Sequence, residues 1–286
     1  MKKVYLWATI AVATGVILTF TSCKKEGVYN PNKKISRIFY QSTGAKQLSQ
    51  TWTWDGNKLS KIDYNQSGNY LHFEYDKRRV SKITDKNGDY TQIIYSGSKI
   101  DKINIYMSNQ LAYTWTFTHK NGKISKMSRE HFSINKNMSE KKMSEALSFI
   151  LPAQTSANIA EVMSMHKNQK AATLTSYTVS FTWKGDNVEK EVYELAYDDG
   201  SLAITSYRNT YDKKKNPYYG FCGDIDVAYN FSKNNLKTVE ETTSSNTVNE
   251  WEYTYTYDGN YPKEQIYIRR YSTSTTTTTT TYEYDK

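Results

Sequence analysis

Apolar and polar positions alternate along short segments over most of the chain. In the segment 71–76, leucine, phenylalanine and tyrosine occupy every second position, between histidine, glutamate and aspartate. In the segment 113–118, aromatic residues alternate in the same way with threonine. Alternation with period two, in residues that are aromatic or β-branched, is typical of strands with one buried face. The chain is therefore predicted to be rich in half-buried strands.

These strands belong to a repeated unit. An aromatic residue, or His119 in one copy, precedes a turn rich in Asp, Asn, Gly or Ser. A basic or polar residue, an aliphatic residue, Ser or Asp, a cation and then Ile or Met follow the turn. The unit recurs at steps of 24, 21, 20 and 24 residues, counted at Lys34, Lys58, Arg79, Lys99 and Lys123.

Each period has room for two strands and two turns. Asp-Gly and Asn-Gly turns, such as Asp55-Gly56 and Asn121-Gly122, tolerate the positive φ that tight hairpins require. Self-similarity at a nearly fixed period is strong evidence for a repeated structural unit. The sequence thus predicts an all-β fold, an antiparallel up-and-down meander of repeated hairpins that forms a curved sheet or a barrel.

One insertion interrupts the meander at about 138–170. Its apolar positions follow helical spacing, which predicts two short helices near 138–151 and 156–168. We interpret these helices as cover for an apolar sheet surface, with a lid or a partner-binding element as the alternative. The repeat resumes at Trp183, and the threonine-rich segment from Thr275 to Tyr284 is interpreted as a last strand rather than a mucin-like stalk.

The first 22 residues indicate export. A basic start at Lys2 and Lys3 precedes an apolar stretch, and small residues then lead to Cys23. This order is typical of a secretory signal. Its end resembles the lipobox of bacterial lipoproteins, which implies that Cys23 is acylated and becomes the first residue of the mature chain. A plain N-terminal membrane anchor is the alternative.

We therefore expect a signal peptide at 1–22, a lipid-anchored linker at 23–34 and a single β domain at 35–286. Lipid on Cys23 would hold the chain to the outer membrane without a membrane-spanning segment. Loss of Lys2 and Lys3 lowers the formal net charge from +9 to +7. Both the periplasmic and the surface side of that membrane stay open.

The turn units also resemble known repeats. Trp54-Asp55-Gly56, Tyr75-Asp76-Lys77 and Tyr257-Asp258-Gly259 are similar to the YD repeats of Rhs-type proteins. The layout from Tyr29 to Lys286 resembles a family of Bacteroidales lipoproteins of unknown function that is described as porin-like. That resemblance implies a closed or nearly closed β-barrel. It implies no activity and no functional residue, and both His119 and the insertion depart from the pattern.

The direction in which the apolar face points separates two classes of protein. A barrel that spans an outer membrane turns its apolar face to the lipid and needs strands of about 9–11 residues. The segments between turns are mostly shorter here, and the polar face carries many charges. We therefore expect a soluble curved sheet or barrel with its aromatic side chains inside, and an integral pore is the alternative.

A row of cations is the candidate ligand site. Each cation directly precedes an Ile or Met of the repeat, so it lies on the opposite, polar face of the sheet. If equivalent strands recur at every second place, neighbouring cations lie about 10 Å apart. Such a row would suit an acidic polysaccharide or another anionic surface, and a solubilising stripe partly neutralised by Glu74 is the alternative. The row consists of Arg37, Lys61, Lys82, Lys102 and Lys126.

The other polar residues indicate no catalytic centre. Two cysteines exclude a disulfide framework, and Cys222 is expected to be a small buried residue because no histidine is near it in the sequence. The histidines lack metal-ligand spacing, and no phosphate-binding glycine loop or nucleophile motif occurs. Asp224 and Asp226 would share one face of a strand. The strand tryptophans are expected in the core rather than stacked on sugars.

The sequence thus predicts a non-enzymatic envelope lipoprotein, without cofactor or metal, that binds a glycan or a protein partner or acts as a scaffold. A pore, or a hydrolase whose site is assembled from distant strands, is the alternative. Carboxyl groups with perturbed pKa values in a cleft would favour the hydrolase. Export argues against nucleic acid as a partner despite the positive charge.

Overall fold

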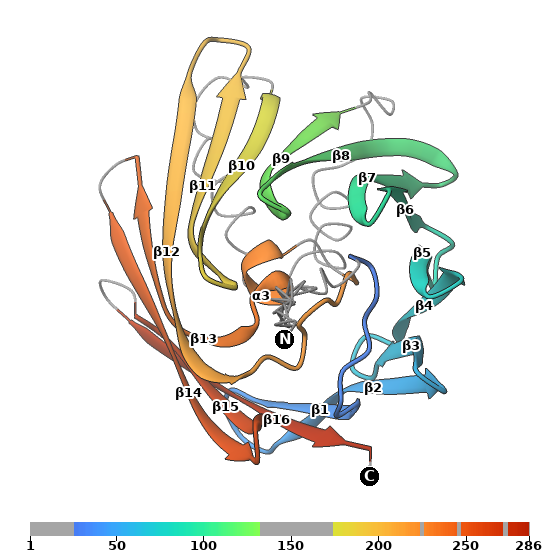
Figure 1. Cartoon of the computed structure of the whole chain (residues 1–286). Coiled ribbons are helices and arrows are strands. Elements are labelled where there is room, and N and C mark those ends of the chain that lie inside the picture. Colours follow the sequence, from blue (N-terminus) through green and yellow to red (C-terminus); the bar gives the residue numbers. More distant parts are fainter. Residues whose placement is uncertain (1–25, 132–173, 224–225, 245–246, 271–273, 286) are drawn as a thin grey trace, which may run out of the picture.

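The computed structural model describes residues 26–131, 174–223, 226–244, 247–270 and 274–285. Sixteen strands form one closed antiparallel barrel in which strands adjacent in sequence pair and β1 pairs with β16 (Figure 1). The strands are β1 (Ile35–Gln41), β2 (Gln47–Asp55), β3 (Lys58–Tyr64), β4 (Asn69–Asp76), β5 (Arg79–Asp85), β6 (Tyr90–Ser96), β7 (Lys99–Met107), β8 (Gln110–Lys120), β9 (Lys123–His131), β10 (Leu174–Lys184), β11 (Asn187–Tyr197), β12 (Leu202–Lys215), β13 (Asn234–Thr243), β14 (Val248–Asp258), β15 (Tyr261–Arg270) and β16 (Thr275–Tyr284).

The predicted fold class is confirmed, and the sheet is a closed barrel. The interpretation of the threonine-rich segment is also confirmed, because it forms β16 and pairs with both β15 and β1. The two helices expected near 138–151 and 156–168 lie outside the described residues. Within the described residues, no helix is long and apolar enough to cross a bilayer.

Each repeated unit folds as a hairpin with a β-bulge beside its turn. In the hairpin of β2 and β3, Thr53 pairs with Lys61 and Trp54 with Leu59, so Ser60 is the extra residue. The Ser60 hydroxyl donates a hydrogen bond to the Thr53 carbonyl at 3.0 Å. Bulges bend and twist a strand, so the small polar position of the repeat marks where each hairpin curves. Equivalent extra residues are Ser81, Asp101 and Ser125.

The aromatic position of the repeat joins each hairpin to the preceding strand. Toward the end of the barrel that carries the turns of the repeat, the pairing of β3 with β4 stops at Lys61 and His72. It does not reach the turns before β3 and after β4. Beyond that point the Tyr75 hydroxyl donates to the Leu59 carbonyl at 2.9 Å. The same bond recurs around the barrel, from Trp54 to Ile35, Tyr95 to Val80, Trp183 to Ile124, Tyr211 to Val188, Tyr255 to Leu236 and Tyr284 to Pro262. We call these seven bonds the aromatic ladder.

The position directly after the turn reinforces this ladder. Lys34 donates to the carbonyl of Gly56 at 2.6 Å, and its ammonium lies over the Trp54 ring at 5.7 Å. Arg79 makes the same two contacts with Gly97 and Tyr95. A cation over an aromatic face gains electrostatic attraction in addition to packing. The first cation of the repeat therefore fastens each hairpin to the next one.

The apolar face of the meander lies inside the barrel, as expected. The aliphatic residues that follow the turns of the repeat, such as Leu59, Val80 and Ile100, are each 1 % exposed. The short helix α3 (Val227–Phe231), which belongs to the connection between β12 and β13, lies within the ring of strands (Figure 1). Burial of the strand tryptophans is also confirmed, since Trp52, Trp115 and Trp251 are buried and Trp54 and Trp183 are half-buried. Cys222 is buried, again as expected.

The interior has two unequal halves. Strands β1 to β10 contribute mostly aliphatic and large aromatic side chains, which pack as one cluster with residues of the α3 connection. Strands β12 to β15 contribute a second cluster that is mainly tyrosine and tryptophan. Polar side chains are buried on this second side as well, among them Asn209, Glu241 and Gln265. The second half therefore offers buried hydrogen-bonding groups beside its aromatic rings.

Removal of one ladder hydroxyl tests the role of the aromatic position. Tyr75→Phe keeps the ring under Lys58 but leaves the Leu59 carbonyl without its donor, so we expect a loss of about 1 kcal/mol in the free energy of unfolding. Tyr70→Phe is the matched control, because the Tyr70 ring lies under Lys61 and its hydroxyl has no ladder role. Denaturant titration of both variants measures the difference, and equal stabilities would contradict the ladder.

Candidate functional site

The five cations predicted as a ligand site lie on the outside of the barrel, on alternate strands from β1 to β9. Arg37 contacts Glu283 at 2.6 Å and Lys61 contacts Asp63 at 2.6 Å. Lys82 contacts Glu74 at 3.2 Å, the acid that the sequence had indicated. Lys102 and Lys126 are exposed. The row is thus partly neutralised, and binding of an anionic glycan to it stays a prediction.

Residues 26–29 pack inside the barrel, at the end where the ladder lies. The amide of Glu26 donates to the Ser98 carbonyl at 3.1 Å, and the Gly27 carbonyl accepts from the Val80 amide at 3.1 Å. Gly27 has a φ of +78°, and a Cβ there would lie 1.9 Å from the Tyr95 hydroxyl. Only glycine fits this position beside a ladder donor. The sequence did not reveal this packing, because the segment has no periodic pattern.

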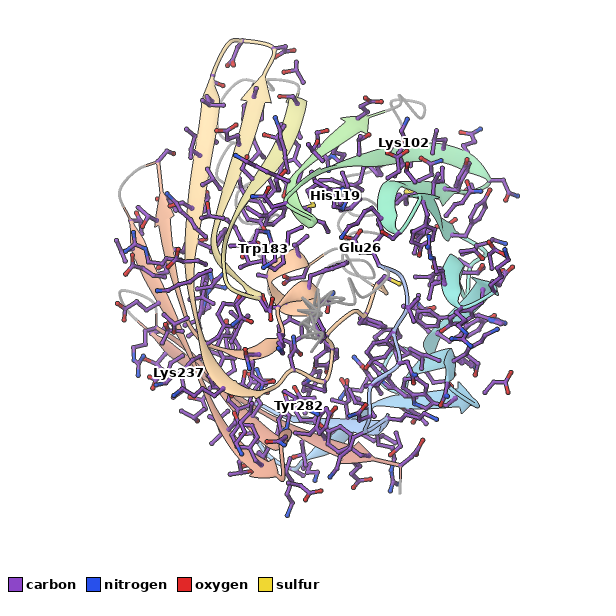
Figure 2. The ribbon with its side chains drawn as sticks, viewed as in Figure 1. Glu26, Lys102, His119, Trp183, Lys237 and Tyr282 are labelled. Carbon is purple, nitrogen blue, oxygen red and sulfur yellow. The ribbon has the colours of Figure 1, made fainter. Side chains whose placement is uncertain are left out.

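Glu26 contacts His119, the residue that stands at the aromatic position of the repeat in one copy. His119 Nε2 lies 3.1 Å from Glu26 Oε2, and the Ile100 amide donates to the same oxygen at 2.7 Å. Lys99 forms an ion pair with Glu26 at 3.2 Å. Figure 2 shows Glu26 and His119 close together toward the middle of the barrel. Glu26 therefore replaces the missing ladder bond between β7 and β8.

The surroundings of Glu26 favour its charged form. Burial alone would raise the pKa of Glu26. The hydrogen bonds from His119 and the Ile100 amide, with the charges of His119 and Lys99, outweigh that effect and lower the pKa below 4.5. The carboxylate is thus ionised at neutral pH and ties the N-terminal segment to two strands.

A cavity of the described interior lies in the tyrosine-rich half. It has a volume of about 60 Å³ that water can reach, and it lies between α3 and the strands β11 to β15. That space is large enough for several waters or a small ligand. Its walls carry tyrosine and tryptophan rings together with a few polar groups, chiefly Glu191, Asn209, Asp226, Tyr207, Trp251 and Tyr253.

Glu191 is a buried carboxyl group of this cavity whose pKa is strongly shifted. Its two carboxyl oxygens accept from the Asn209 amide at 3.0 Å and from the Tyr193 hydroxyl at 3.2 Å. Burial, and then the charge of Asp226, raise the pKa of Glu191 to about 8. At neutral pH this carboxyl group is therefore mostly protonated and uncharged.

Two residues that line the cavity each carry an unsatisfied polar atom. Asn209 uses its amide nitrogen on Glu191, and its Oδ1 has no hydrogen-bond partner within the described part of the chain. The indole Nε1 of Trp251 also has none there. Both residues are 5 % exposed. A buried donor or acceptor without a partner costs about 1–3 kcal/mol, so this pair marks a place where a ligand would be stabilising.

The structure corrects the expectation for Asp224 and Asp226. Asp226 is not on a strand but is the N-cap of α3, where its side chain accepts from the Tyr229 amide at 2.8 Å; Asp224 lies outside the described residues. The cause is that the connection between β12 and β13 folds inward instead of forming a tight turn. Among the described residues, no group of three His, Cys, Asp or Glu side chains could hold a metal ion.

Glu191 and Asn209 were missed in the sequence, although a signal exists. Both occupy inward positions of their strands, and most inward positions of the first half carry aliphatic or aromatic residues. A polar residue at an inward position becomes informative only once the inside of the barrel is known to be closed and mostly apolar.

The pH dependence of stability tests the role of Glu26. Because its pKa is lowered in the folded chain, the stability it contributes is fully present above about pH 4.5 and is lost as the pH falls through the lower folded value. Glu26→Gln should therefore cost about 2 kcal/mol at pH 7 and much less near pH 3. Glu74→Gln, at an exposed ion pair, should cost under about 1 kcal/mol. Denaturant titration of the chain from Lys24 measures both, and a pH-independent difference for Glu26→Gln would refute the assignment.

Comparison with known proteins gives a likeness in fold. No protein-family model and no curated protein matches the sequence. A porin-like protein from Bacteroides vulgatus ATCC 8482 is similar in structure, with a TM-score of 0.54 and 7% identity over 89% of this chain and 99% of that one. A porin-like protein from Bacteroides uniformis ATCC 8492 has a TM-score of 0.51 and 10% identity over 88% and 98% of the chains. This chain therefore has the fold of porin-like barrels.

Proposed function

We propose that the protein is a non-enzymatic cell-envelope lipoprotein, a closed barrel that binds a glycan or a protein partner rather than conducting ions. The observation that carries this proposal is the burial of the apolar face inside the barrel. Outer-membrane pores have the opposite arrangement, with an apolar band facing lipid and a polar lumen.

A pore is the second candidate, because the fold is similar to that of porin-like proteins. Barrels of 16–18 strands are wide enough to leave an aqueous channel. In this chain, α3 and residues 26–29 occupy the interior at the ladder end, where Tyr29 contacts both Trp52 and Phe221. The outward positions carry ion pairs such as Arg270 with Glu252. A filled lumen and a charged exterior favour a binding module.

The proposed anchor also sets an orientation. Only Lys24 and Lys25 separate Cys23 from Glu26, and three residues span at most about 11 Å. Because Glu26 is buried at the ladder end, acyl chains on Cys23 would hold that end close to the membrane. Cations at the hairpin turns, including Lys34, Lys58 and Lys123, would then face the lipid headgroups, which suits an anionic surface.

The solubility of the chain from Lys24 to Lys286 separates the binding module from the pore. Without detergent we expect a soluble, β-rich protein by circular dichroism and light scattering. Planar-bilayer recordings should show no channel events at concentrations at which a known porin, as the positive control, does. Insolubility without detergent, together with steady conductance that changes on Lys61→Glu, would reverse the proposal and place the cation row in a pore.

Metabolic labelling tests the anchor. In a Gram-negative host, the full chain should incorporate labelled fatty acid and fractionate with the outer membrane. Cys23→Ser should abolish both, because the acylated thiol is gone. Cys222→Ser is the matched control and should keep the label, since its thiol is buried in the barrel. Label retained by Cys23→Ser would rule out the lipoprotein assignment.

A further inference from the structure

We propose that the cavity beside α3 binds one neutral sugar residue, either free or at the end of a glycan chain. The inference rests on the proposed function, because it needs a closed lumen that does not conduct. It names a site and a ligand class, and it places the ligand inside the barrel rather than on the external cation row.

Aromatic side chains provide the stacking surfaces. The Tyr207 ring stacks on the Trp251 ring at an angle of 23°, with centroids 5.7 Å apart, and lies edge-on to Tyr193 at 5.1 Å. The Arg269 guanidinium also lies over the Trp251 ring, at 5.1 Å. Tyr253 and Tyr267 form a second pair at 5.2 Å on the neighbouring strands. All five aromatic residues line the cavity. Flat aromatic faces with polar rims suit ligands that have an apolar C–H face and polar edges.

The unsatisfied atoms define what those edges must carry. Asn209 Oδ1 needs a donor and Trp251 Nε1 needs an acceptor. A hydroxyl group can do either, so a ring with several hydroxyl groups satisfies both atoms at once. An ammonium group has no acceptor for Trp251, and an aliphatic ligand has neither function.

Charge restricts the ligand further. Glu191 and Asp226 line the cavity, and Glu241 is buried nearby, with its Oε1 bound to the Tyr207 hydroxyl at 2.7 Å. Asp226 and Glu241 would repel a carboxylate or phosphate ligand, and the buried Arg269, whose guanidinium lies over the Trp251 ring at 5.1 Å, supplies an opposing charge at this wall. Burial raises the pKa of Glu191, which weakens its attraction for a cation, and an ammonium group offers no acceptor to Trp251 Nε1. The combination favours an uncharged ligand.

The hydrolase alternative draws on the same two acids, since Glu191 has a raised pKa beside Asp226. Each of these carboxyl groups already has a structural role. Glu191 accepts from Asn209 and Tyr193, and Asp226 caps α3. A glycosidase needs one carboxyl group free to protonate the leaving oxygen and a second to act as nucleophile or base. The site is therefore assigned to binding.

Ligand-detected NMR and titration calorimetry on the chain from Lys24 test the proposal. The probes are glucose, galactose and N-acetylglucosamine, with glucuronate and glucosamine as the charged counterparts. At least one neutral sugar should bind saturably, and its anionic and cationic counterparts should bind at least about tenfold more weakly. No saturable binding of any neutral sugar, or equal binding of the charged ones, would overturn the proposal.

A matched pair of tryptophan variants locates the site. Trp251→Phe keeps an aromatic ring, although a smaller one, and removes the unsatisfied N–H, so affinity should fall about five- to tenfold, the effect of one hydrogen bond, while the ladder bonds are kept. Trp183→Phe removes the N–H that donates to Ile124 in the ladder, so stability should fall and affinity stay unchanged. Loss of affinity in both variants, or in neither, would place the ligand elsewhere.

The same sugar as its nitrophenyl glycoside separates this proposal from failure of the proposed function. We expect the glycoside to bind and to remain uncleaved. Cleavage by the wild type that is lost in Glu191→Gln would make the protein a hydrolase and overturn the binding module. Channel activity would overturn the closed lumen itself, whereas a soluble, non-conducting barrel that ignores sugars would overturn only the ligand class.

Discussion

The hydrogen bond from an aromatic side chain to a main-chain carbonyl of the preceding strand is the interaction on which this barrel depends. Bulges curve each hairpin near its turn, and pairing between hairpins stops before the turn is reached. The carbonyls beyond that point would be buried without a donor, which is costly. One aromatic residue per repeat provides the donor, fills the interior and carries the cation of the preceding repeat on its face. The period of the sequence is therefore the period of this bond.

The exception to the ladder explains how the N-terminal segment is held. His119 stands where the other copies have Tyr or Trp, and Glu26 bridges His119 and the Ile100 amide instead. Tyr29 then donates to the Pro217 carbonyl, which links the segment to the connection that contains α3. The wall of the barrel, the N-terminal segment and α3 are thus one bonded unit at the ladder end. A change at Glu26 would be transmitted directly to β7 and β8.

The sequence predicted those features of the fold that a local pattern of residues determines. Alternation and Asp-Gly turns gave the hairpins, and the same alternation gave the inward aromatic face. The pairing of β1 with β16 depends on contact between the two ends of the chain, which no local pattern contains. Glu26 and the connection from Asn216 to Ser232 lack periodicity, so their place in the lumen was not predictable. The predicted row of cations, which includes Lys61, lies on the outer face of the barrel. The cations directly after the turns, such as Lys34, make the contacts between hairpins.

The cavity follows from the same geometry. A sixteen-strand barrel is too wide for its own wall side chains to fill, so α3 and residues 26–29 must complete the core. They pack against the half that carries aliphatic and large aromatic side chains. The opposite half keeps polar residues at inward positions. Apolar side chains packed against these residues would leave their polar atoms without hydrogen-bond partners. A chain that only needed a stable core would place leucine at 209 and phenylalanine at 251, because unsatisfied polar atoms cost more than apolar ones in a closed interior. The presence of Asn209 and Trp251 beside the cavity is the reason to regard this half of the lumen as the functional one.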